Sequence, residues 1–317
     1  MDEAEPIVAH RPLLFAIAYR MLGSVTDAED VLQEAFLRWH RARVDDTAVD
    51  SPKAWLSTVV TRLCLDQLRS ARVRREQYVG PWLPEPLAVE TEPDVADAAV
   101  LSDTISTAFL LLLETLSPKE RAVFLLHDVF AYGYAEIGGI VGESEVYCRQ
   151  LARRARAHLA DRRPRFAASP ADQQRLAETF LRAATDGALP ALVATLAEDV
   201  VYRADGGPNA QAARRPVHGA DKVARLLIGL TQKAPADLVS TVETINGGPG
   251  IVSRVAGRAV AVVTFAADEA IREIQFVVNP AKLRGVDPPA RGIRGAPAAP
   301  PDALASTSDA QGRAAGA

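Results

Sequence analysis

Basic and amide side chains gather at the start of a helix that the sequence predicts at about residues 144–162. This helix follows a short helix at about 134–141 and a glycine, Gly142, which is the spacing of a helix–turn–helix. In that motif the second helix enters the major groove of DNA, where arginine can pair with guanine and glutamine with adenine. The early residues that face base edges are Glu145, Val146, Arg149 and Gln150, and Ser144, where the helix starts, is a further candidate for DNA binding.

Three further arginines of the same helix lie beyond its first turns, where side chains can reach phosphates and make binding depend on salt. They are Arg153, Arg154 and Arg156. A helix whose basic face is merely solvated would show the same spacing, because basic helices are common at protein surfaces. The residues of this helix therefore leave DNA binding and a solvated helical hairpin open as alternatives.

A second concentration of charge occurs on two predicted helices within residues 11–78. A capping box of Thr26 with Glu29 predicts the start of the first helix. Its outer face carries Asp27, Asp30, Gln33 and Glu34. Ser51 followed by Pro52 predicts the start of the second helix. The basic residues on its outer face are Lys53, Arg62, Arg69, Arg72, Arg74 and Arg75.

These two helices have opposite chemistry. The acidic face suits a basic protein partner, whereas the basic helix could hold a single nucleic-acid strand, because positive charge follows the backbone of such a strand. The alternative is a three-helix bundle whose charged groups are all solvated. On these residues alone, the solvated bundle is the preferred interpretation.

Between the two helical parts, residues 79–97 are predicted to form a linker rich in proline and acidic residues. It contains the stretch GPWLPEPL at residues 80–87. Proline resists helix interiors and can hold a chain extended. The apolar pair Trp82-Leu83 needs a surface to cover it. We therefore expect this stretch to dock on the C-terminal domain, with the first helical part as the alternative surface.

The pattern changes after about residue 168, where an amphipathic helix at about 170–186 precedes several short runs that favour β-strands. The runs are residues 199–203, 238–245, 251–255, 259–266 and 271–278. They predict an α+β domain over residues 168–283. Residues 284–317 contain almost no large apolar side chain, and we expect them to be disordered.

The 317-residue chain is 48% hydrophobic, which supports two or three packed domains, and its net charge of −4 does not by itself indicate a nucleic-acid binder. Cys64 and Cys148 are far apart and lack neighbours at metal-ligand spacing, so we expect no disulfide, no metal and no other cofactor. The N-terminal residues lack the apolar segment of a signal peptide, and no apolar run has the length of a membrane helix. A cytoplasmic protein is therefore expected.

Two long stretches resemble bacterial sigma factors of the extracytoplasmic-function type. DAEDVLQEAFLRWHR, followed by SPKAWLSTVVTRLCLDQLRSARVRRE, resembles region two of that family. LSPKERAVFLLHDVFAYGYAEIGGIVGESEVYCRQLARRARAHL resembles region four. The two occur in the order and at the spacing of the family. The resemblance predicts an all-α region-two domain at residues 8–78 and an all-α helix–turn–helix domain of region four at residues 98–164.

The resemblance implies a dissociable subunit that directs core RNA polymerase to promoters in transcription initiation. Region two would bind the polymerase clamp through the face that carries Asp27 and Glu34, and its basic helix would open and grip the minus-ten promoter element. Region four would contact the polymerase flap and read the minus-thirty-five element with the helix that starts at Ser144. The expected partners are core RNA polymerase and promoter DNA, with no membrane.

The linker and the C-terminal part resemble the subgroup with a fused SnoaL-like domain, the sigma factor J type. Its W-L-P-E-P motif is present as Trp82, Leu83, Pro84, Glu85 and Pro86. Its N-P-D-K-L motif is represented by Asn279, Pro280, Ala281, Lys282 and Leu283. Its D-G-G-G-K motif is kept only at Asp205, Gly206 and Gly207, and then departs at Pro208 and Asn209. The resemblance implies a cone-shaped α+β domain that contacts the rest of the chain and regulates the sigma factor in cis.

Some SnoaL-like relatives are isomerases or cyclases, so acid–base residues in the cone are candidates for catalysis. They are Asp199, Tyr202, Asp205, His218 and Asp221. The sequence does not show that they converge, and Asp205-Gly206-Gly207 is more simply a turn. The preferred interpretation is a regulatory protein surface without enzyme activity. A pocket for a small effector is the second interpretation, and catalysis is the third.

Two other classes of protein stay open as alternatives. A one-component helix–turn–helix regulator with a ligand-sensing C-terminal domain would bind duplex DNA without polymerase, as a dimer on two half-sites. The acidic-faced first helical part, with its basic partner helix, argues against this class. A SnoaL-type enzyme with a helical appendage is the other, and it would leave the N-terminal half unexplained.

Overall fold

The computed structural model describes residues 5–45, 49–76, 78–88, 105–160, 169–208 and 210–287. The chain divides into two compact units, Met1–Asp287 and Pro288–Ala317. The predicted tail from residue 288 onward and the predicted linker residues 89–97 lie outside the described residues. None of the helices within the described ranges combines the length and the apolar character that a membrane span requires.

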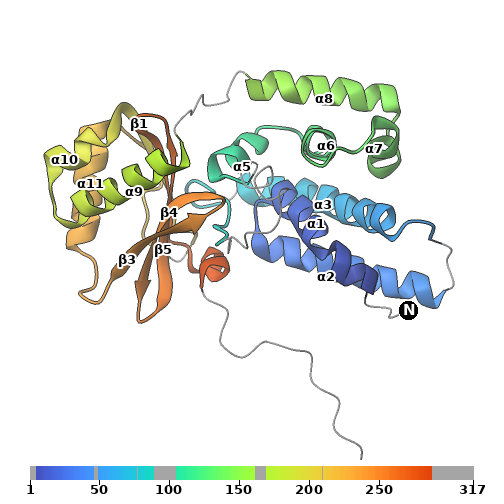
Figure 1. Ribbon diagram of the computed structural model, residues 1–317, viewed down its shortest axis with the longest axis horizontal. Helices are drawn as coiled ribbons and strands as arrows, with labels where there is room; N and C mark the ends of the chain where they lie inside the picture. The colour runs from blue at the N-terminus through green and yellow to red at the C-terminus, as the bar shows by residue number, and fades with distance from the viewer. Residues whose placement is uncertain are drawn as a thin grey trace, which may run out of the picture. The chain divides into compact units, whose positions relative to one another are not determined.

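The described residues of the first helical part form α1 (Glu5–Leu22), α2 (Val25–Val44) and α3 (Pro52–Glu76) (Figure 1). Apolar residues at helical spacing give α2 one face that packs inward. This predicted pattern is confirmed, because Ala28 and Leu32 are buried in the core.

The predicted start of α2 is wrong. Its N-cap is Ser24, whose Oγ accepts a hydrogen bond from the Asp27 amide at 3.0 Å. Thr26 lies within the helix, and Glu29 forms an ion pair with Arg11 of α1 at 2.7 Å. The T-x-x-E pattern has the right residues for a cap, but tertiary contacts place the helix start two residues earlier.

The second helical part contains four α-helices and a π-helical turn among its described residues. They are α5 (Thr107–Leu113), α6 (Pro118–Phe124), η1 (Leu125–Val129), α7 (Tyr134–Val141) and α8 (Glu145–Ala160). The predicted capping box is confirmed, since Ser117 and Glu120 exchange side-chain-to-amide hydrogen bonds. The helix α7 ends at Gly142, whose φ of +72° is the left-handed conformation that favours glycine. With this turn between them, α7 and α8 form a helix–turn–helix.

The two helical parts pack around one hydrophobic core, although the sequence predicted a domain for each. Leu14 and Leu56 of the first part are fully buried in it, as is Ile137 of the second. The guanidinium of Arg121, also buried, donates from Nη1 to the carbonyl oxygen of Met21 at 2.6 Å. Burial lowers the pKa of Arg121 to about 10, so this side chain remains charged at neutral pH.

The described residues of the C-terminal domain place three α-helices on a mixed sheet. Its helices are α9 (Pro170–Thr185), α10 (Leu189–Ala194) and α11 (Ala220–Gln232). Its described strands are β1 (Leu196–Asp205), β2 (Val217–His218), β3 (Val239–Ile245), β4 (Gly248–Val255), β5 (Arg258–Ala267) and β6 (Ile271–Val277). They lie in the order β2-β1-β6-β5-β4-β3, and the β1–β6 pair is parallel while the other pairs are antiparallel. The five predicted strand runs are confirmed, whereas β2 is too short to show a pattern.

Both faces of this sheet are apolar. The helices α9, α10 and α11 cover one face (Figure 1). Alternate residues of the strands point to it, among them Ile251, Val263 and Ile274. The opposite face carries Val252, Val262 and Val277. Leu83 packs on that second face together with Leu111 of α5, so segments from outside the domain cover it.

The folded domain continues beyond its predicted end at residue 283. Two short 3-10 helices follow β6, η2 (Pro280–Lys282) and η3 (Arg284–Val286). Val286 is buried on the second face of the sheet, and the Asp287 carboxylate accepts a hydrogen bond from the Ala259 amide at 2.8 Å. A single valine among small and polar residues was too weak a signal to extend the predicted domain.

Candidate functional site

Asp205, at the end of β1, is fully buried beneath the connector, which we define as residues 78–88. Its Oδ1 accepts hydrogen bonds from the Tyr78 hydroxyl at 2.6 Å and the Gly207 amide at 3.1 Å. Its Oδ2 accepts from the Leu83 amide at 2.8 Å and from Lys282 Nζ at 2.7 Å. We call these five residues the Asp205 cluster. Each carboxylate oxygen has two donors, so the buried group is satisfied by residues from three separate segments.

Lys282, which belongs to the motif at residues 279–283, contacts the W-L-P-E-P motif of the connector. Its side chain is buried and its ammonium group also donates to the Leu83 carbonyl oxygen. The same nitrogen lies 4.2 Å from the centroid of the Trp82 ring and 5.2 Å from that of Tyr78. A cation over an aromatic face is attracted to the ring quadrupole, most strongly where water is excluded. Lys282 therefore binds the connector through charge, hydrogen bonds and ring contacts.

Two glycines allow the close approach of backbone in this cluster. A Cβ on Gly207, whose φ is +57°, would lie 2.6 Å from Asn279 Nδ2. A Cβ on Gly206 would lie 2.7 Å from the Ala210 carbonyl oxygen. Asn279 in turn donates to the Tyr78 hydroxyl at 2.9 Å. Larger residues would therefore push apart the groups that hold the connector.

The departures from the D-G-G-G-K motif leave the Asp205 carboxylate paired. Pro208 is exposed, and Asn209 lies outside the described residues. The lysine that binds the carboxylate is Lys282 of the other motif, which follows Pro280 at the start of η2. Leu283 is buried on the sheet directly after it. One lysine is thus sufficient to neutralise the buried charge.

The connector also binds the first helical part, through Glu85. Its carboxylate accepts from Ser24 Oγ at 2.9 Å and from the amides of Val25 and Thr26 at 2.8 and 3.1 Å. The Glu85 amide donates to the Gly23 carbonyl oxygen at 2.8 Å. An anion is favourable at a helix N-terminus, where amides lack partners. Both docking surfaces considered from the sequence are therefore in contact with the connector.

Asn246, at the turn between β3 and β4, is a contact residue that the sequence does not indicate. Its Oδ1 accepts from the Leu87 amide at 3.1 Å, and its Nδ2 donates to the Tyr19 hydroxyl at 2.6 Å and the Ile105 carbonyl oxygen at 2.9 Å. Asn246 has a φ of +52° and precedes Gly247. The Asn-Gly pair is a signal for a hairpin turn. It carries no information about what the tip of the hairpin touches.

Replacing Trp82 by alanine is expected to weaken the docking of the connector by about 1–2 kcal/mol, because it removes the ring that lies over Lys282. The ring also covers Gly23, where a Cβ would lie 2.8 Å from it. The rate of limited proteolysis within the connector measures the effect. Val79→Ala is the matched control, since that side chain is 44% exposed. Equal cleavage of the Trp82→Ala variant and the control would contradict this account of the docking.

Two residues that the sequence assigned to DNA binding face the second helical part. Arg62 of α3 donates from Nε to the Ile140 carbonyl oxygen at 3.0 Å and from Nη2 to that of Gly139 at 2.9 Å. Lys53 Nζ lies 5.9 Å from the centroid of the Tyr132 ring. The last carbonyl groups of a helix attract cations. The guanidinium of Arg62 therefore caps α7 from another helix.

Arg69 is the other basic residue of α3 whose side chain the structure describes. Arg69 is exposed and pairs with Asp66 one turn earlier at 3.1 Å. The side chains of the last three lie outside the described residues, namely Arg72, Arg74 and Arg75. Ser57, further toward the start of α3, shares a buried 2.8 Å hydrogen bond with the Tyr132 hydroxyl. Among the described side chains of α3, those of Lys53, Ser57 and Arg62 are thus turned toward the second helical part.

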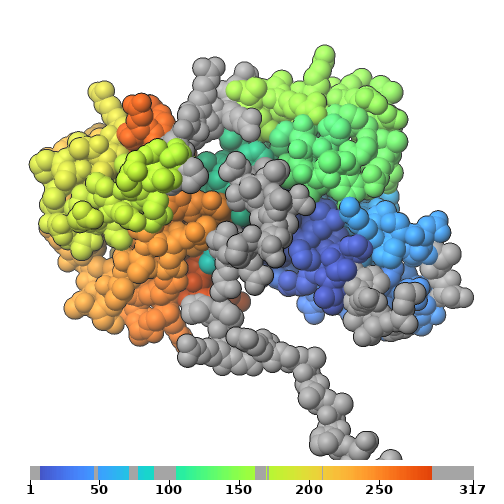
Figure 2. All heavy atoms as spheres, viewed as in Figure 1, coloured from blue at the N-terminus to red at the C-terminus, as the bar shows by residue number. Residues whose placement is uncertain are grey.

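The helix α8 lies at the surface, where its light-green atoms are visible in Figure 2. The predicted DNA-contacting residues are all exposed: Ser144, Glu145, Val146, Arg149, Gln150, Arg153, Arg154 and Arg156. Ser144 Oγ accepts from the Tyr147 amide at 3.2 Å, which satisfies one free donor at the helix start. The polar face predicted for this helix is therefore accessible along its length.

The acidic face of α2 points away from the core. Asp30 and Gln33 are exposed, while Asp27 and Glu34 are half-buried. Glu34 pairs with Arg38 on the same helix at 2.8 Å. An ion pair of this kind at a surface contributes little to stability. The four residues therefore remain available to a partner.

The acid–base candidates do not converge. Asp205 is bound beneath the connector, Tyr202 is buried in the apolar core beneath the helices, and His218 is exposed on the edge strand β2. The other two are exposed and paired with arginines, Asp199 with Arg272 at 3.2 Å and Asp221 with Arg225 at 2.8 Å. A proton-transfer pair needs both groups in one cavity. The described side chains do not provide one from this set.

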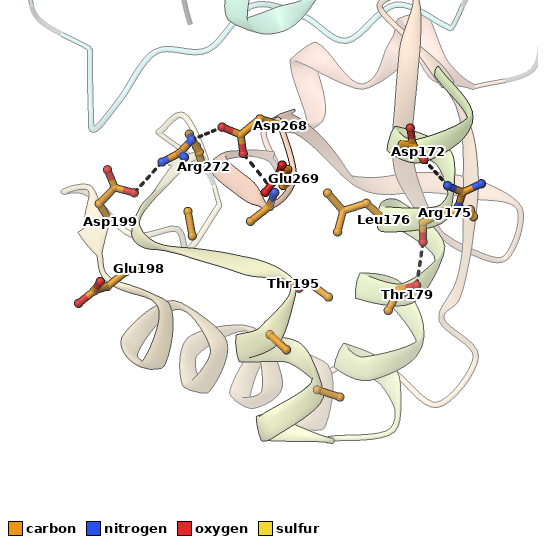
Figure 3. A pocket seen from close by; sticks show the side chains of 14 residues that line it. Asp172, Arg175, Leu176, Thr179, Thr195, Glu198, Asp199, Asp268, Glu269 and Arg272 are labelled. Carbon is orange, nitrogen blue, oxygen red and sulfur yellow. Dashed lines mark hydrogen bonds and ion pairs between the residues drawn. The ribbon is translucent and has the colours of Figure 1, made fainter. Parts of the chain in front are cut away.

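A groove of about 1610 Å³ lies among α9, α10, the start of β1 and the β5–β6 turn (Figure 3). Three of its acidic groups, Asp172, Asp199 and Asp268, pair with arginines. Asp268 pairs with Arg272 at 2.6 Å, and this hydrogen bond lowers the pKa of Asp268. Asp172 pairs with Arg175. Among the described residues, no group of three or more His, Cys, Asp or Glu side chains is placed to hold a metal ion.

Known proteins match this arrangement over most of the chain. The models of Sigma-70 region 2 and Sigma-70, region 4 match residues 7–74 and 106–159. The ECF RNA polymerase sigma factor SigJ of Mycobacterium tuberculosis is 40% identical over 233 residues, which are 73% of this chain and 74% of SigJ. The probable ECF RNA polymerase sigma factor SigI of the same species is 34% identical over 291 residues, 89% of this chain and 97% of SigI.

The crystal structure of Mycobacterium tuberculosis SigJ is similar with a TM-score of 0.69 and 35% identity, over 87% of this chain and 96% of that one. This chain belongs to the family of ECF RNA polymerase sigma factors. Its first helical part (α1–α3) is region two, and its second (α5–α8) is region four. The α+β domain that follows has the SnoaL-like architecture of helices on one face of a mixed sheet.

Proposed function

We propose that this sigma factor grips the minus-ten promoter element with α3 and reads the minus-thirty-five element with α8, and that its C-terminal domain regulates both steps in cis. The acidic face of α2 binds the clamp of core RNA polymerase, and region four binds the flap. The protein acts in the cytoplasm together with that enzyme. The C-terminal domain is regulatory rather than catalytic, which the separation of Asp205 from His218 supports.

The observation that carries the regulatory part is the double attachment of the connector. Glu85 binds the start of α2. Leu83, two residues before Glu85 in the chain, binds Asp205 of the C-terminal domain. Both carboxylates are buried. A change in the C-terminal domain therefore acts directly on the segment that joins the two promoter-binding regions.

The contacts between region two and region four define a closed arrangement. Arg62 cannot bind the carbonyl oxygens of Gly139 and Ile140 and a promoter strand at the same time. Asn246 of the C-terminal domain also holds the backbone of Ile105, directly before α5. We infer that the C-terminal domain favours the closed arrangement, and that region four leaves α3 before the promoter is opened.

Two variants separate closure from promoter contact. Tyr132→Phe leaves the buried Ser57 hydroxyl without its partner, at a cost of about 1–3 kcal/mol, and Arg62→Ala removes the cap on α7. Both are expected to speed hydrogen–deuterium exchange in α7. With core RNA polymerase, Tyr132→Phe is expected to raise the yield of run-off transcript, whereas Arg62→Ala lowers it because the same side chain contacts the promoter.

Arg69→Ala is the matched control for the loss of a positive charge on α3. Its side chain is exposed and contacts Asp66 only within the helix. It is expected to lower transcription without changing exchange in α7. Unchanged exchange in both Tyr132→Phe and Arg62→Ala would show that these contacts do not hold region four. Absence of any promoter-specific transcript from the unmodified protein with core enzyme would overturn the proposed function itself.

A further inference from the structure

Tyr134, the first residue of α7, makes contacts that the closed arrangement does not explain. Its ring stacks on the His127 imidazole, with centroids 4.0 Å apart and an angle of 26° between the planes. The guanidinium carbon of Arg149 lies 4.8 Å from the centroid of the same ring. The Arg149 side chain is otherwise exposed and pairs with Glu145 at 2.5 Å. The Tyr134 ring therefore restricts the Arg149 side chain, which would sample many conformations in water.

The hydroxyl group of Tyr134 reaches a second arginine of the same helix. Arg156 donates from Nη2 to this oxygen at 3.2 Å and from Nε to the Asp128 carboxylate at 2.8 Å. Arg149 and Arg156 are two helical turns apart, so both lie along one side of α8. One tyrosine thus contacts an arginine placed to face base edges and an arginine placed to face phosphates.

We propose that Tyr134 is a positioning residue for the upstream promoter duplex. Its ring holds the guanidinium plane of Arg149 for a two-point contact with guanine, and its hydroxyl directs Arg156 toward the backbone. The planar fork of arginine matches the guanine edge only when it is correctly turned. Because the Arg149 side chain is already restricted in the free protein, it loses less conformational entropy when the promoter duplex binds. This proposal rests on the proposed reading of the minus-thirty-five element by α8.

The test is run-off transcription by the full chain with core RNA polymerase, on promoters selected from a library randomised in the upstream element. Arg149→Ala first identifies the base pair at which guanine is preferred. At that pair, Tyr134→Leu is expected to reduce the preference for guanine roughly tenfold, the order of one bidentate contact. Tyr134→Phe keeps the ring and is expected to retain the preference while lowering the total yield two- to threefold, because only the contact to Arg156 is lost.

Tyr147→Leu is the control, because it also removes a half-buried aromatic ring, in this case from α8. The ring that contacts Arg149 and the hydroxyl that contacts Arg156 both belong to Tyr134 and are kept in this variant. It is expected to leave the guanine preference unchanged. An equal loss of transcription by Tyr134→Leu on guanine and substituted promoters would overturn the proposal, because that is the result of a purely structural role. If Arg149→Ala changes no preference in the upstream element, reading by Arg149 is wrong and the proposal falls with it. A failure of the unmodified protein to give any specific transcript overturns the proposed function instead.

Discussion

Asp205→Ala is expected to destabilise the folded chain by about 3–5 kcal/mol and to release the connector, because it leaves a buried cation without its partner. The side chain of Lys282 is only 8% exposed, so water cannot replace the lost carboxylate. The amides of Leu83 and Gly207 and the hydroxyl of Tyr78 lose their acceptor as well. The free energy of unfolding from a denaturant titration measures the loss, and proteolysis within residues 78–88 reports the release.

Asp199→Ala is the control, because that carboxylate is 80% exposed in its pair with Arg272 and should change stability by less than about 1 kcal/mol. The double variant Asp205→Leu with Lys282→Met removes both buried charges. It is expected to recover part of the stability, since replacing a whole buried ion pair costs less than breaking it. If Asp205→Ala behaves like the control, the buried pair does not hold the connector.

Asn246→Gly is expected to lower the free energy of unfolding by about 2–4 kcal/mol, because buried groups that bonded to the amide lose their partner. The Tyr19 hydroxyl, the Leu87 amide and the Ile105 carbonyl oxygen are the groups concerned. Glycine adopts a φ of +52° without strain, so the turn itself is retained. Faster hydrogen–deuterium exchange at the start of α5 and in α1 would locate the loss at the contacts of the hairpin tip.

The β4–β5 hairpin offers a matched control for this substitution. Ala256 at its tip has a φ of +49° and is exposed. Ala256→Gly is expected to raise the free energy of unfolding by about 1 kcal/mol, because it relieves a left-handed conformation that a Cβ disfavours. Two glycine substitutions at similar turns should therefore act in opposite directions. Unchanged stability of Asn246→Gly would show that the three side-chain hydrogen bonds are not needed to hold the hairpin tip.

Local signals determined the elements of this protein and their order. The Ser117–Glu120 capping box, the stop at Gly142 and the strand runs involve residues close together in the chain, and each is present as predicted. The resemblance to sigma factors also rested on contiguous stretches and was confirmed. The failed cap at Thr26 has a specific cause. The amide groups of this helix start bind Glu85, a residue that local sequence does not associate with α2.

Tertiary structure alone decided which side chains meet. Arg62 looks like any other arginine on a basic helix, yet its partners are carbonyl oxygens at the end of α7. Asn246 and Tyr19 are 227 residues apart, and neither has a neighbour that indicates the other. A cap or a helical face depends on residues within a few positions, and so the sequence contains it. A buried contact between distant segments depends on the packing of every element between them, and only the folded chain specifies it.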